Sequence, residues 1–390
     1  MKEIYLDNSA TTRISEEALA KYTEISRECF GNPSSLHKMG YNAESVVKAA
    51  RDELLLSLGA RGARAVFTAS GSEANNLAIV GRALSKERYR RGAKIITTEG
   101  EHASVNEPLS YLEGLGFKIV RISTKNGVLD MDELRSALTR DVILVTAMMV
   151  NNETGALYDI PAVARLMKAN CPEAYLHIDA TQSYMKLPFT KASLGADMIT
   201  VSSHKIEGPK GVGALIIDER VIKERGLSPL ILGGGQEGGL RSGTENVPGI
   251  AAFGEAAKIG RSRLRERFEK MSTLREYFLE KLNTSPALSE ISPTLPQSHA
   301  PQIVNITLPG IKSETMLHYL SSFGIFVSSG SACSSNTGHI SSALTAYGRS
   351  ETEADCSIRI SFSHRNEKED VDAFCEALES GLSKLARIKQ

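Results

Sequence analysis

Strand-like and helix-like segments alternate through the first two-thirds of this chain, and this alternation constrains the fold more than any other feature. Short runs rich in β-branched and other apolar residues predict strands at Ala65–Thr68, Lys94–Thr98, Phe117–Ile122, Val142–Met148, Ala174–Ile178, Asp197–Val201 and Val212–Ile217. Helical patterns lie between most of these runs; examples are Met131–Leu138, which follows a capping Asp130, and Ile160–Lys168. The succession is typical of βαβ units, so it predicts an α/β fold with a mostly parallel seven-stranded sheet covered on both faces.

The last third of the chain has a different pattern. A long helical stretch from about residue 249 to 282 is followed by strands expected at Ile303–Thr307 and Ile358–Phe362 and a helix at Lys368–Lys384. Fewer strands here predict a smaller α+β domain. The first dozen residues have no helical pattern and are expected to return to it. We therefore expect a large domain over residues 14–255 and a small domain made of residues 1–13 and 256–390.

Composition and charge exclude several classes of protein. The chain has 390 residues, 41% of them hydrophobic and 24% charged, which are ordinary globular values and suffice for two cores. Its formal net charge is zero, so nothing favours nucleic acid or an anionic membrane as a main partner. The sequence lacks an apolar run of membrane-spanning length, and its first residues lack the basic and apolar regions of a signal peptide. A cytoplasmic protein is expected.

The cysteines are odd in number and share neither a CxxC motif nor a close metal-site spacing. They predict reduced thiols in a reducing compartment, with no disulfide framework and no metal site. Four of them lie in or beside apolar or helical patterns and are expected to be inert: Cys29, Cys171, Cys356 and Cys375. Cys333 differs, because its neighbours from Ser328 to Gly338 are nearly all Ser, Gly, Asn or Thr.

Two of the predicted strands are followed by polar residues that can carry chemistry. The first is followed by Asp179, and the next by Ser202-Ser203-His204-Lys205. A lysine held at a crevice beside a sheet is desolvated, which lowers its pKa as Schiff-base chemistry requires. An aspartate on a nearby strand end keeps a pyridine nitrogen protonated, so the pair is the one that a pyridoxal phosphate enzyme needs. Taken alone, the lysine is more simply explained as a solvated surface charge.

Three further segments are compatible with the same cofactor, and each also has a purely structural explanation. Small residues over Ala69–Asn76 open a helix whose N-terminus can receive a phosphate, unless Ser70 or Ser72 only caps that helix. His102 can stack on an aromatic ring or be a polar residue at a helix start. Asn151–Gly155 can form a plain turn, or one asparagine can bond the phenolic oxygen of the cofactor.

Short motifs in the order of one known family run from residue 5 to about residue 362. They are Tyr5–Thr12, Gly31–Ser35 with His37, Glu101-His102, Asn151–Gly155, His177–Gln182, Ser202–Lys205, Gly233–Glu237, Arg241–Asn246 and Ser328–Cys333. They resemble the signatures of the cysteine desulfurases, which are class-V pyridoxal phosphate-dependent transferases of fold type I. The serine-flanked Cys333 resembles the first group of that family, which serves iron–sulfur cluster assembly and tRNA thiolation.

The resemblance implies roles around the cofactor, pyridoxal 5'-phosphate. Lys205 would hold the cofactor covalently and move protons at the substrate Cα, and Asp179 would pair with the pyridine nitrogen. Gln182 and Asn152 would contact the phenolic oxygen, and His102 would stack on the ring. The phosphate would be held by Gly71, Ser72, Ser202 and His204.

The resemblance also implies a substrate site and an assembly. Arg359 would bind the substrate carboxylate through its fork-shaped guanidinium, with Asn152 beside it; the alternative is a surface arginine on an edge strand. Because Ile358 and Ile360 are apolar, Arg359 is expected to point away from the core in either case. Thr244 would reach a phosphate in the neighbouring subunit, which implies a homodimer.

Cys333 would be the nucleophile, unless it is a structural cysteine in a tight turn. A Ser/Gly-rich segment has little to bury and a low barrier to moving, as a sulfur carrier requires. The reactive form is the thiolate, which His102 would help to form. The expectation is a cysteine desulfurase that converts L-cysteine to L-alanine and leaves a persulfide on Cys333. An iron–sulfur scaffold or a thiolation enzyme would accept the sulfur.

Two departures from the family pattern concern that acceptor. The residues after Cys333 lack the Glu-Pro pair of many relatives, and the chain stops soon after its last predicted helix. The acceptor protein and the activity on selenocysteine are therefore left open. Selenocysteine lyase, another class-V activity such as an aminotransferase, and a cofactor-less binding protein of the same fold are the alternatives.

Overall fold

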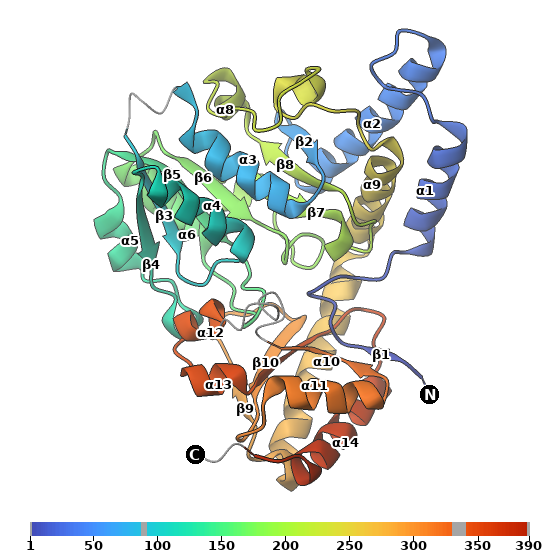
Figure 1. Ribbon diagram of the computed structural model, residues 1–390, viewed down its shortest axis with the longest axis vertical. Helices are drawn as coiled ribbons and strands as arrows, with labels where there is room; N and C mark the ends of the chain where they lie inside the picture. The colour runs from blue at the N-terminus through green and yellow to red at the C-terminus, as the bar shows by residue number, and fades with distance from the viewer. Residues whose placement is uncertain (1, 87–91, 330–340, 388–390) are drawn as a thin grey trace.

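The computed structural model describes residues 2–86, 92–329 and 341–387, which form a large and a small body (Figure 1). The large body is built on a seven-stranded sheet in the order β2-β8-β7-β6-β5-β3-β4. Its strands are β2 Arg64–Thr68, β3 Lys94–Thr98, β4 Lys118–Ile122, β5 Val142–Met148, β6 Tyr175–Asp179, β7 Met198–Ser202 and β8 Gly213–Ile217. β8 runs in the opposite direction to the other strands of this sheet, which are parallel to one another. The predicted α/β fold with a mostly parallel seven-stranded sheet is confirmed.

Two of these strands end one residue later than the apolar pattern predicts. That pattern places the end of β6 at Ile178 and the end of β7 at Val201, whereas the strands continue through Asp179 and Ser202. Both polar residues still pair within the sheet, Asp179 with the neighbouring strands β5 and β7, and Ser202 with β8. The two candidate site residues are therefore fixed by the sheet and do not belong to loops.

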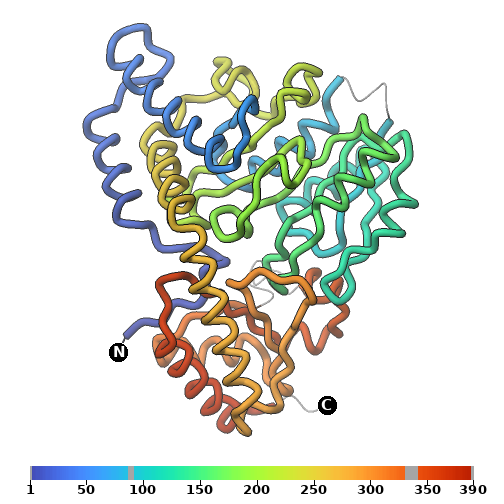
Figure 2. Tube along the Cα trace, turned by 180° about the vertical axis from the view of Figure 1, so that it is seen from behind, coloured from blue at the N-terminus to red at the C-terminus, as the bar shows by residue number. Residues whose placement is uncertain are grey.

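Helices cover both faces of this sheet (Figures 1 and 2). On one face lie α3 Gly71–Ala83, α4 Ala103–Gly114 and α8 Glu219–Lys223. On the other lie α1 Glu16–Glu28, α2 Lys38–Ser57, α5 Met131–Ala137, α6 Ile160–Asn170, α7 Lys191–Leu194 and α9 Val247–Ser262. Asp130 caps α5 as predicted, because its side chain accepts from the backbone N of Asp132 and Glu133.

The long helical stretch expected over residues 249–282 consists of two helices, α9 and α10 Leu264–Thr284. The backbone of Arg263 leaves the helical region between them, with φ −113° and ψ 13°. α9 packs on α1 and α2 in the large body, whereas α10 packs on α14 Lys368–Lys384 in the small body. Figure 2 shows this helix pair running from one body into the other.

The small body has a four-stranded antiparallel sheet in the order β12-β13-β10-β9. Its strands are β9 Ser292–Thr294, β10 Ile303–Thr307, β12 Ser328–Ser329 and β13 Ser357–Ser361. Its other helices are α11 Ser313–Ser322, α12 Ser342–Tyr347 and α13 Glu351–Asp355. Phe278 of α10 packs on Phe374 of α14, with ring centroids 5.6 Å apart, at the centre of a separate hydrophobic core.

The N-terminal segment adds to the small body before it enters the large one. β1 Ile4–Tyr5 pairs in parallel with β11 Ile325–Phe326, and Asp7 forms a bridge to Ser361. Short 3₁₀ turns lie at η2 Lys125–Gly127, η3 Ser203–Lys205, η4 Gln236–Gly239 and η5 Pro286–Leu288. The domain boundaries named from the sequence stay a prediction. In the ranges described, none of the helices has both the length and the apolar character needed to cross a membrane.

Candidate active site

The candidate site lies at the carboxyl ends of β6 and β7, the edge where open α/β sheets bind ligands. Asp179, the last residue of β6, is buried. Asn75 Nδ2, from α3, donates to Asp179 Oδ2 at 2.8 Å, and the backbone N of Thr181 donates to Oδ1 at 2.9 Å. These two bonds fix the direction of the carboxylate. The sequence analysis did not identify Asn75 as a site residue. The sequence feature that could have indicated it is an amide side chain in the first turns of a helix that begins with glycine.

Lys205 ends the turn η3, which follows β7 directly. Its Nζ donates to the backbone oxygens of Ser9 and Ala10, to the latter at 2.9 Å. The N-terminal segment therefore passes over the lysine and holds its amine. Because β6 and β7 are paired neighbours, the sheet brings Lys205 and Asp179 to the same edge, as the sequence predicts.

The start of α3 lies close against the end of β7. A Cβ atom on Gly71 would lie 3.2 Å from Ser202 Cβ and 3.4 Å from Thr181 Oγ1, so only glycine leaves this approach unhindered. Ser202 Oγ is buried and has no hydrogen-bond partner among the described residues. A buried hydroxyl without a partner is costly, and a phosphate oxygen would satisfy it. The residues present therefore fit the phosphate of pyridoxal phosphate.

The other residues expected at the phosphate are Ser72 and His204. Ser72 stands in the first turn of α3, but Ser70 is the cap, since its Oγ accepts from the backbone N of Glu73 at 3.1 Å. The structural explanation for this segment is thus correct for Ser70. His204 Nδ1 lies 3.2 Å from Thr11 Oγ1, and burial lowers the pKa of His204 to about 4. The imidazole of His204 is therefore neutral at pH 7.

His102 is the residue before α4 and caps that helix. Its Nδ1 accepts from the backbone N of Ser104 at 3.1 Å and lies 2.9 Å from Ser104 Oγ. Burial lowers the pKa of His102, and the charge of Asp179 opposes this shift in part. His102 is thus a polar residue at a helix start, and this role is compatible with either explanation. Stacking on a cofactor stays a prediction.

Gln182 is held between two groups of the chain. Its Nε2 donates to the Ser9 backbone oxygen at 2.9 Å, and its Oε1 accepts from Lys186 Nζ at 3.1 Å. Burial is the main cause that lowers the pKa of Lys186 to about 7, and the charges of Lys205 and Arg359 add to it. The sequence analysis missed Lys186, although the sequence places a lysine within the apolar run Tyr184–Phe189, a few residues after β6.

Arg359 lies on β13, which has a partner strand on each side. The alternative of a surface arginine on an edge strand is therefore wrong. Ile358 and Ile360 are buried in the small core, and Arg359 points to the other side of the sheet, as predicted. There Nη2 donates to Asp7 Oδ1 at 2.9 Å and Nη1 to the backbone oxygen of Asn152 at 3.0 Å. The guanidinium is buried at the junction of the two bodies.

Residues 4–374 of the chain match the family described as aminotransferase class-V. The chain belongs to this family. It is 37% identical to a NifS/IcsS protein homolog of Lactobacillus delbrueckii subsp. bulgaricus over 389 residues, 99% of this chain and 98% of that protein. It is 36% identical to the cysteine desulfurase IscS of Dictyoglomus turgidum, covering 99% of this chain and 96% of that protein. A solved NifS-like protein has a TM-score of 0.90 at 34% identity, covering 98% of this chain and all of that one.

These relatives confirm the resemblance to the cysteine desulfurases, and class-V enzymes depend on pyridoxal phosphate. Two further residues are expected in the site of this class-V chain, Thr244 and Cys333. Thr244 lies in an exposed segment before α9, so a contact with a second subunit stays a prediction. Cys333 lies outside the described residues.

Three of the remaining cysteines of the class-V chain are buried: Cys171, Cys356 and Cys375. Burial raises the pKa of the Cys171 thiol to about 11 and that of Cys375 to about 12, and it also raises the pKa of Cys356. These thiols stay protonated at neutral pH, as expected of inert cysteines. Among the residues that the structure describes, no group of three or more His, Cys, Asp or Glu side chains could hold a metal ion.

Glu101 is a second buried carboxyl group that the sequence analysis did not single out as a site residue. Its Oε1 accepts from Thr98 Oγ1 at 2.6 Å and from the backbone N of Met148 at 2.8 Å. Burial raises the pKa of Glu101 from 4.5 to about 8. This carboxyl group is therefore protonated at neutral pH, directly beside His102.

Glu101→Gln is expected to flatten the pH dependence of stability. Between pH 4.5 and about 8 the folded protein keeps a proton on Glu101 that the unfolded chain has lost. The contribution of this group is thus complete below pH 4.5 and is lost as the pH rises towards 8. Between about pH 5 and about pH 8, the free energy of unfolding of the wild type should fall by roughly 1 kcal/mol or more beyond the fall in the variant. Urea denaturation at each pH measures this difference. Parallel profiles would contradict this assignment.

Proposed function

We propose that this class-V protein is a cysteine desulfurase, which converts L-cysteine to L-alanine and transfers the sulfur atom to Cys333 as a persulfide. The observation that carries the proposal is the placement of Asp179 and Lys205 at the ends of adjacent strands. In the overall reaction the Cβ–S bond of the substrate breaks and an S–S bond to Cys333 forms. The hydrogen of the Cys333 thiol replaces sulfur on the alanine carbon, and the transferred sulfur keeps its own hydrogen.

The residues of the site would divide the work around the cofactor. Pyridoxal phosphate, when bound, supplies an electron sink for the substrate Cα. Asp179 would face its pyridine nitrogen, and Lys205 would attach it and carry a proton at Cα. Gln182 and Asn152 would lie at its phenolic oxygen. The phosphate would be held by Gly71, Ser72, Ser202 and His204, with Thr244 of a second subunit.

The environment of His102 supports a role at the substrate sulfur. Because Nδ1 accepts from the backbone N of Ser104, the neutral ring carries its proton on Nε2. That proton can be donated to a thiolate, which stabilises the reactive form of a cysteine sulfur. His102 would thus act by hydrogen bonding as well as by stacking.

Arg359→Ala is expected to raise the KM for L-cysteine by at least about tenfold, because a charge-assisted contact to a carboxylate contributes roughly 2–4 kcal/mol. The visible absorbance of the bound cofactor should stay as in the wild type. Arg359→Lys keeps the positive charge but loses the fork-shaped guanidinium, so its KM should lie between those of the wild type and Arg359→Ala. Asp7→Asn is the matched control, since it breaks the ion pair at 2.9 Å and leaves the guanidinium in place. A KM within twofold of the wild type for Arg359→Ala would assign the arginine a structural role.

The experiment that tests the proposed function is incubation of the cofactor-loaded protein with L-cysteine and a reductant. Alanine and sulfide should form in equal amounts, because each turnover releases one of each. An aminotransferase would yield a keto acid without sulfide. Absence of cofactor absorbance, or a keto acid as the main product, would overturn the proposal.

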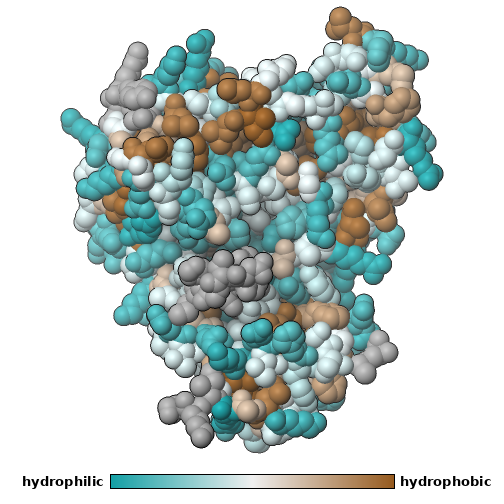
Figure 3. All heavy atoms as spheres, viewed as in Figure 1, coloured by the Kyte–Doolittle hydropathy of each residue, from teal (hydrophilic) through white to brown (hydrophobic). Residues whose placement is uncertain are grey.

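A homodimer with shared sites is part of the proposal. The end of the large body formed by α1 and α2 carries hydrophobic surface on the face shown in Figure 3. Exposed apolar side chains of this end are Phe30, Leu36 and Tyr41. Their exposure supports burial against a second copy, and sedimentation of the loaded protein tests it.

The setting of the reaction is also proposed. The acceptor of the sulfur would be a protein of iron–sulfur cluster assembly or of tRNA thiolation. A reducing cytoplasm would keep the cysteines as thiols.

A further inference from the structure

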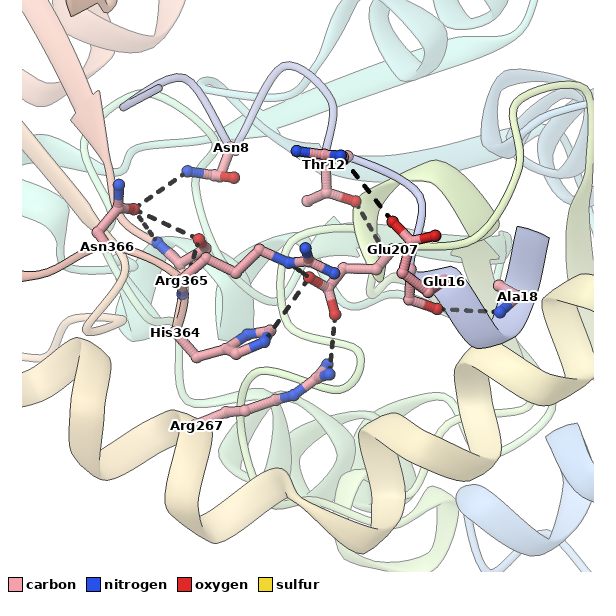
Figure 4. A network of polar contacts seen from close by, with 12 residues as sticks. Asn8, Thr12, Glu16, Ala18, Glu207, Arg267, His364, Arg365 and Asn366 are labelled. Atoms are coloured by element: carbon pink, nitrogen blue, oxygen red, sulfur yellow. Dashed lines mark hydrogen bonds and ion pairs between the residues drawn. The ribbon is translucent and has the colours of Figure 1, made fainter. Parts of the chain in front are cut away.

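Glu207 is a buried carboxylate that the chemistry above does not use. It follows Lys205 by two residues, and its side chain is only 7% exposed. Its Oε2 accepts from Arg267 Nη2 at 2.8 Å, and its Oε1 accepts from Arg365 Nε at 2.6 Å. His364 Nε2 lies 3.7 Å from the same Oε1. Figure 4 shows these side chains converging on the carboxylate.

These partners come from elements that belong to the small body. Arg267 stands on α10, while His364 and Arg365 lie in the loop between β13 and α14. The carboxylate itself belongs to the segment that leaves β7 in the large body. The four residues, called here the Glu207 cluster, therefore join the lysine turn to the small body.

The backbone of Glu207 is held as firmly as its side chain. Its φ of 67° lies in the left-handed region, which glutamate rarely adopts. Its N donates to Thr12 Oγ1 at 2.7 Å, and its O accepts from the Ser15 N at 2.9 Å. The N of Thr12 also donates to the backbone oxygen of His204 at 2.9 Å. The N-terminal segment thus clamps the chain on both sides of Lys205.

The Glu207 cluster also borders Lys205 in space. A cavity of about 30 Å³ is lined by Lys205 and Glu207 together with Arg267 and His364. Arg365 in turn follows the strand that carries Arg359. The Glu207 cluster is therefore connected to the lysine on one side and to the strand that carries Arg359 on the other.

We propose that Glu207 is a positioning residue that fixes the separation of Lys205 and Arg359 by tying the lysine turn to the small body. The inference rests on the proposed function only for the roles of these two residues. The Arg267 side chain is 8% exposed, so removing the charge of Glu207 leaves a buried guanidinium uncompensated. The lysine turn and the β13–α14 loop should both loosen as a result. Displacement of reacting groups by as little as about 1 Å can slow a reaction about a hundredfold.

The test is amide hydrogen exchange of the cofactor-loaded protein, measured by mass spectrometry for segments 203–212 and 360–367. In Glu207→Gln, exchange should rise at least about threefold in both segments, and kcat should fall about tenfold with KM changed less than about threefold. Lys270→Met is the matched control, because the ion pair of Lys270 with Glu367 also joins α10 to the start of α14 without touching the lysine turn. The control should leave exchange in segment 203–212 unchanged.

Arg365→Met provides a second variant that preserves the fold, since the Arg365 side chain is 40% exposed. It should raise exchange in the same two segments, and adding it to Glu207→Gln should change little, because the two residues act through one contact. If Glu207→Gln does not fold, Arg365→Met decides. The inference is overturned if exchange in segment 203–212 stays unchanged in Glu207→Gln and Arg365→Met, or if it rises equally in Lys270→Met. Lack of desulfurase activity in the wild type would overturn the proposed function and leave the exchange result standing.

Discussion

Replacing Cys333 by serine is expected to reduce alanine and sulfide formation by at least about a thousandfold, because a hydroxyl group is a far weaker nucleophile towards sulfur than a thiolate. Cofactor binding does not depend on this thiol, so the visible absorbance should remain and should still change when L-cysteine is added. After a single turnover, intact mass should show one extra sulfur atom on the wild-type chain and none on Cys333→Ser.

The other cysteines provide the matched controls for this variant. Cys171 and Cys375 are buried, and their thiols have a raised pKa, so neither is a thiolate at neutral pH. Replacing either by alanine should leave sulfide release within about twofold of the wild type, unless the cavity destabilises the fold. If Cys333→Ser forms alanine at the wild-type rate, sulfur is not transferred to this residue and a lyase or aminotransferase replaces the proposed function.

Lys205→Ala is expected to lose covalent attachment of the cofactor and to reduce turnover by at least about a thousandfold. Borohydride reduction of the loaded wild type should fix the cofactor to the peptide that contains Lys205. The same treatment of the variant should leave the chain at its unmodified mass.

Lys186→Met is the matched control for the lysine. Lys186 is buried, its amine donates to Gln182, and its pKa is lowered to about 7, so it is another amine that could react. Its replacement should keep the covalent label on Lys205. A label that persists in Lys205→Ala and disappears in Lys186→Met would reverse the assignment of the attachment site.

The sequence suffices for those parts of the site that depend on local patterns. Asp179 and Lys205 can be located because each stands at or just after the end of an apolar strand, and parallel strands bring such ends to one edge. The helix cap at Asp130 can also be predicted, because it depends only on the residues next to it in the sequence. The break between α9 and α10 could not be predicted, because the residue at the break is Arg263 and not the Pro or Gly that usually interrupts a helix.

Residues whose role depends on distant partners could not be found in this way. Glu207 looks like an ordinary charged residue in a loop, since the two arginines that bury it lie far along the chain. Asn75 contacts a carboxylate that lies 104 residues further along the chain, and Lys186 becomes unusual only through burial. The roles taken from the family resemblance for the candidate site residues stay predictions until the variants above are measured.

The N-terminal segment makes completion of the site depend on contacts between parts of the chain that are far apart in sequence. The carbonyl groups of Ser9 and Ala10 receive the Lys205 amine, but this segment is itself held by Phe326 and Ser361. Ser9 and Ser361 are 352 residues apart. Contacts of such long sequence separation form late in folding. A folding chain whose large sheet has already formed would therefore still have an uncovered lysine until the N-terminal segment docks on the small body.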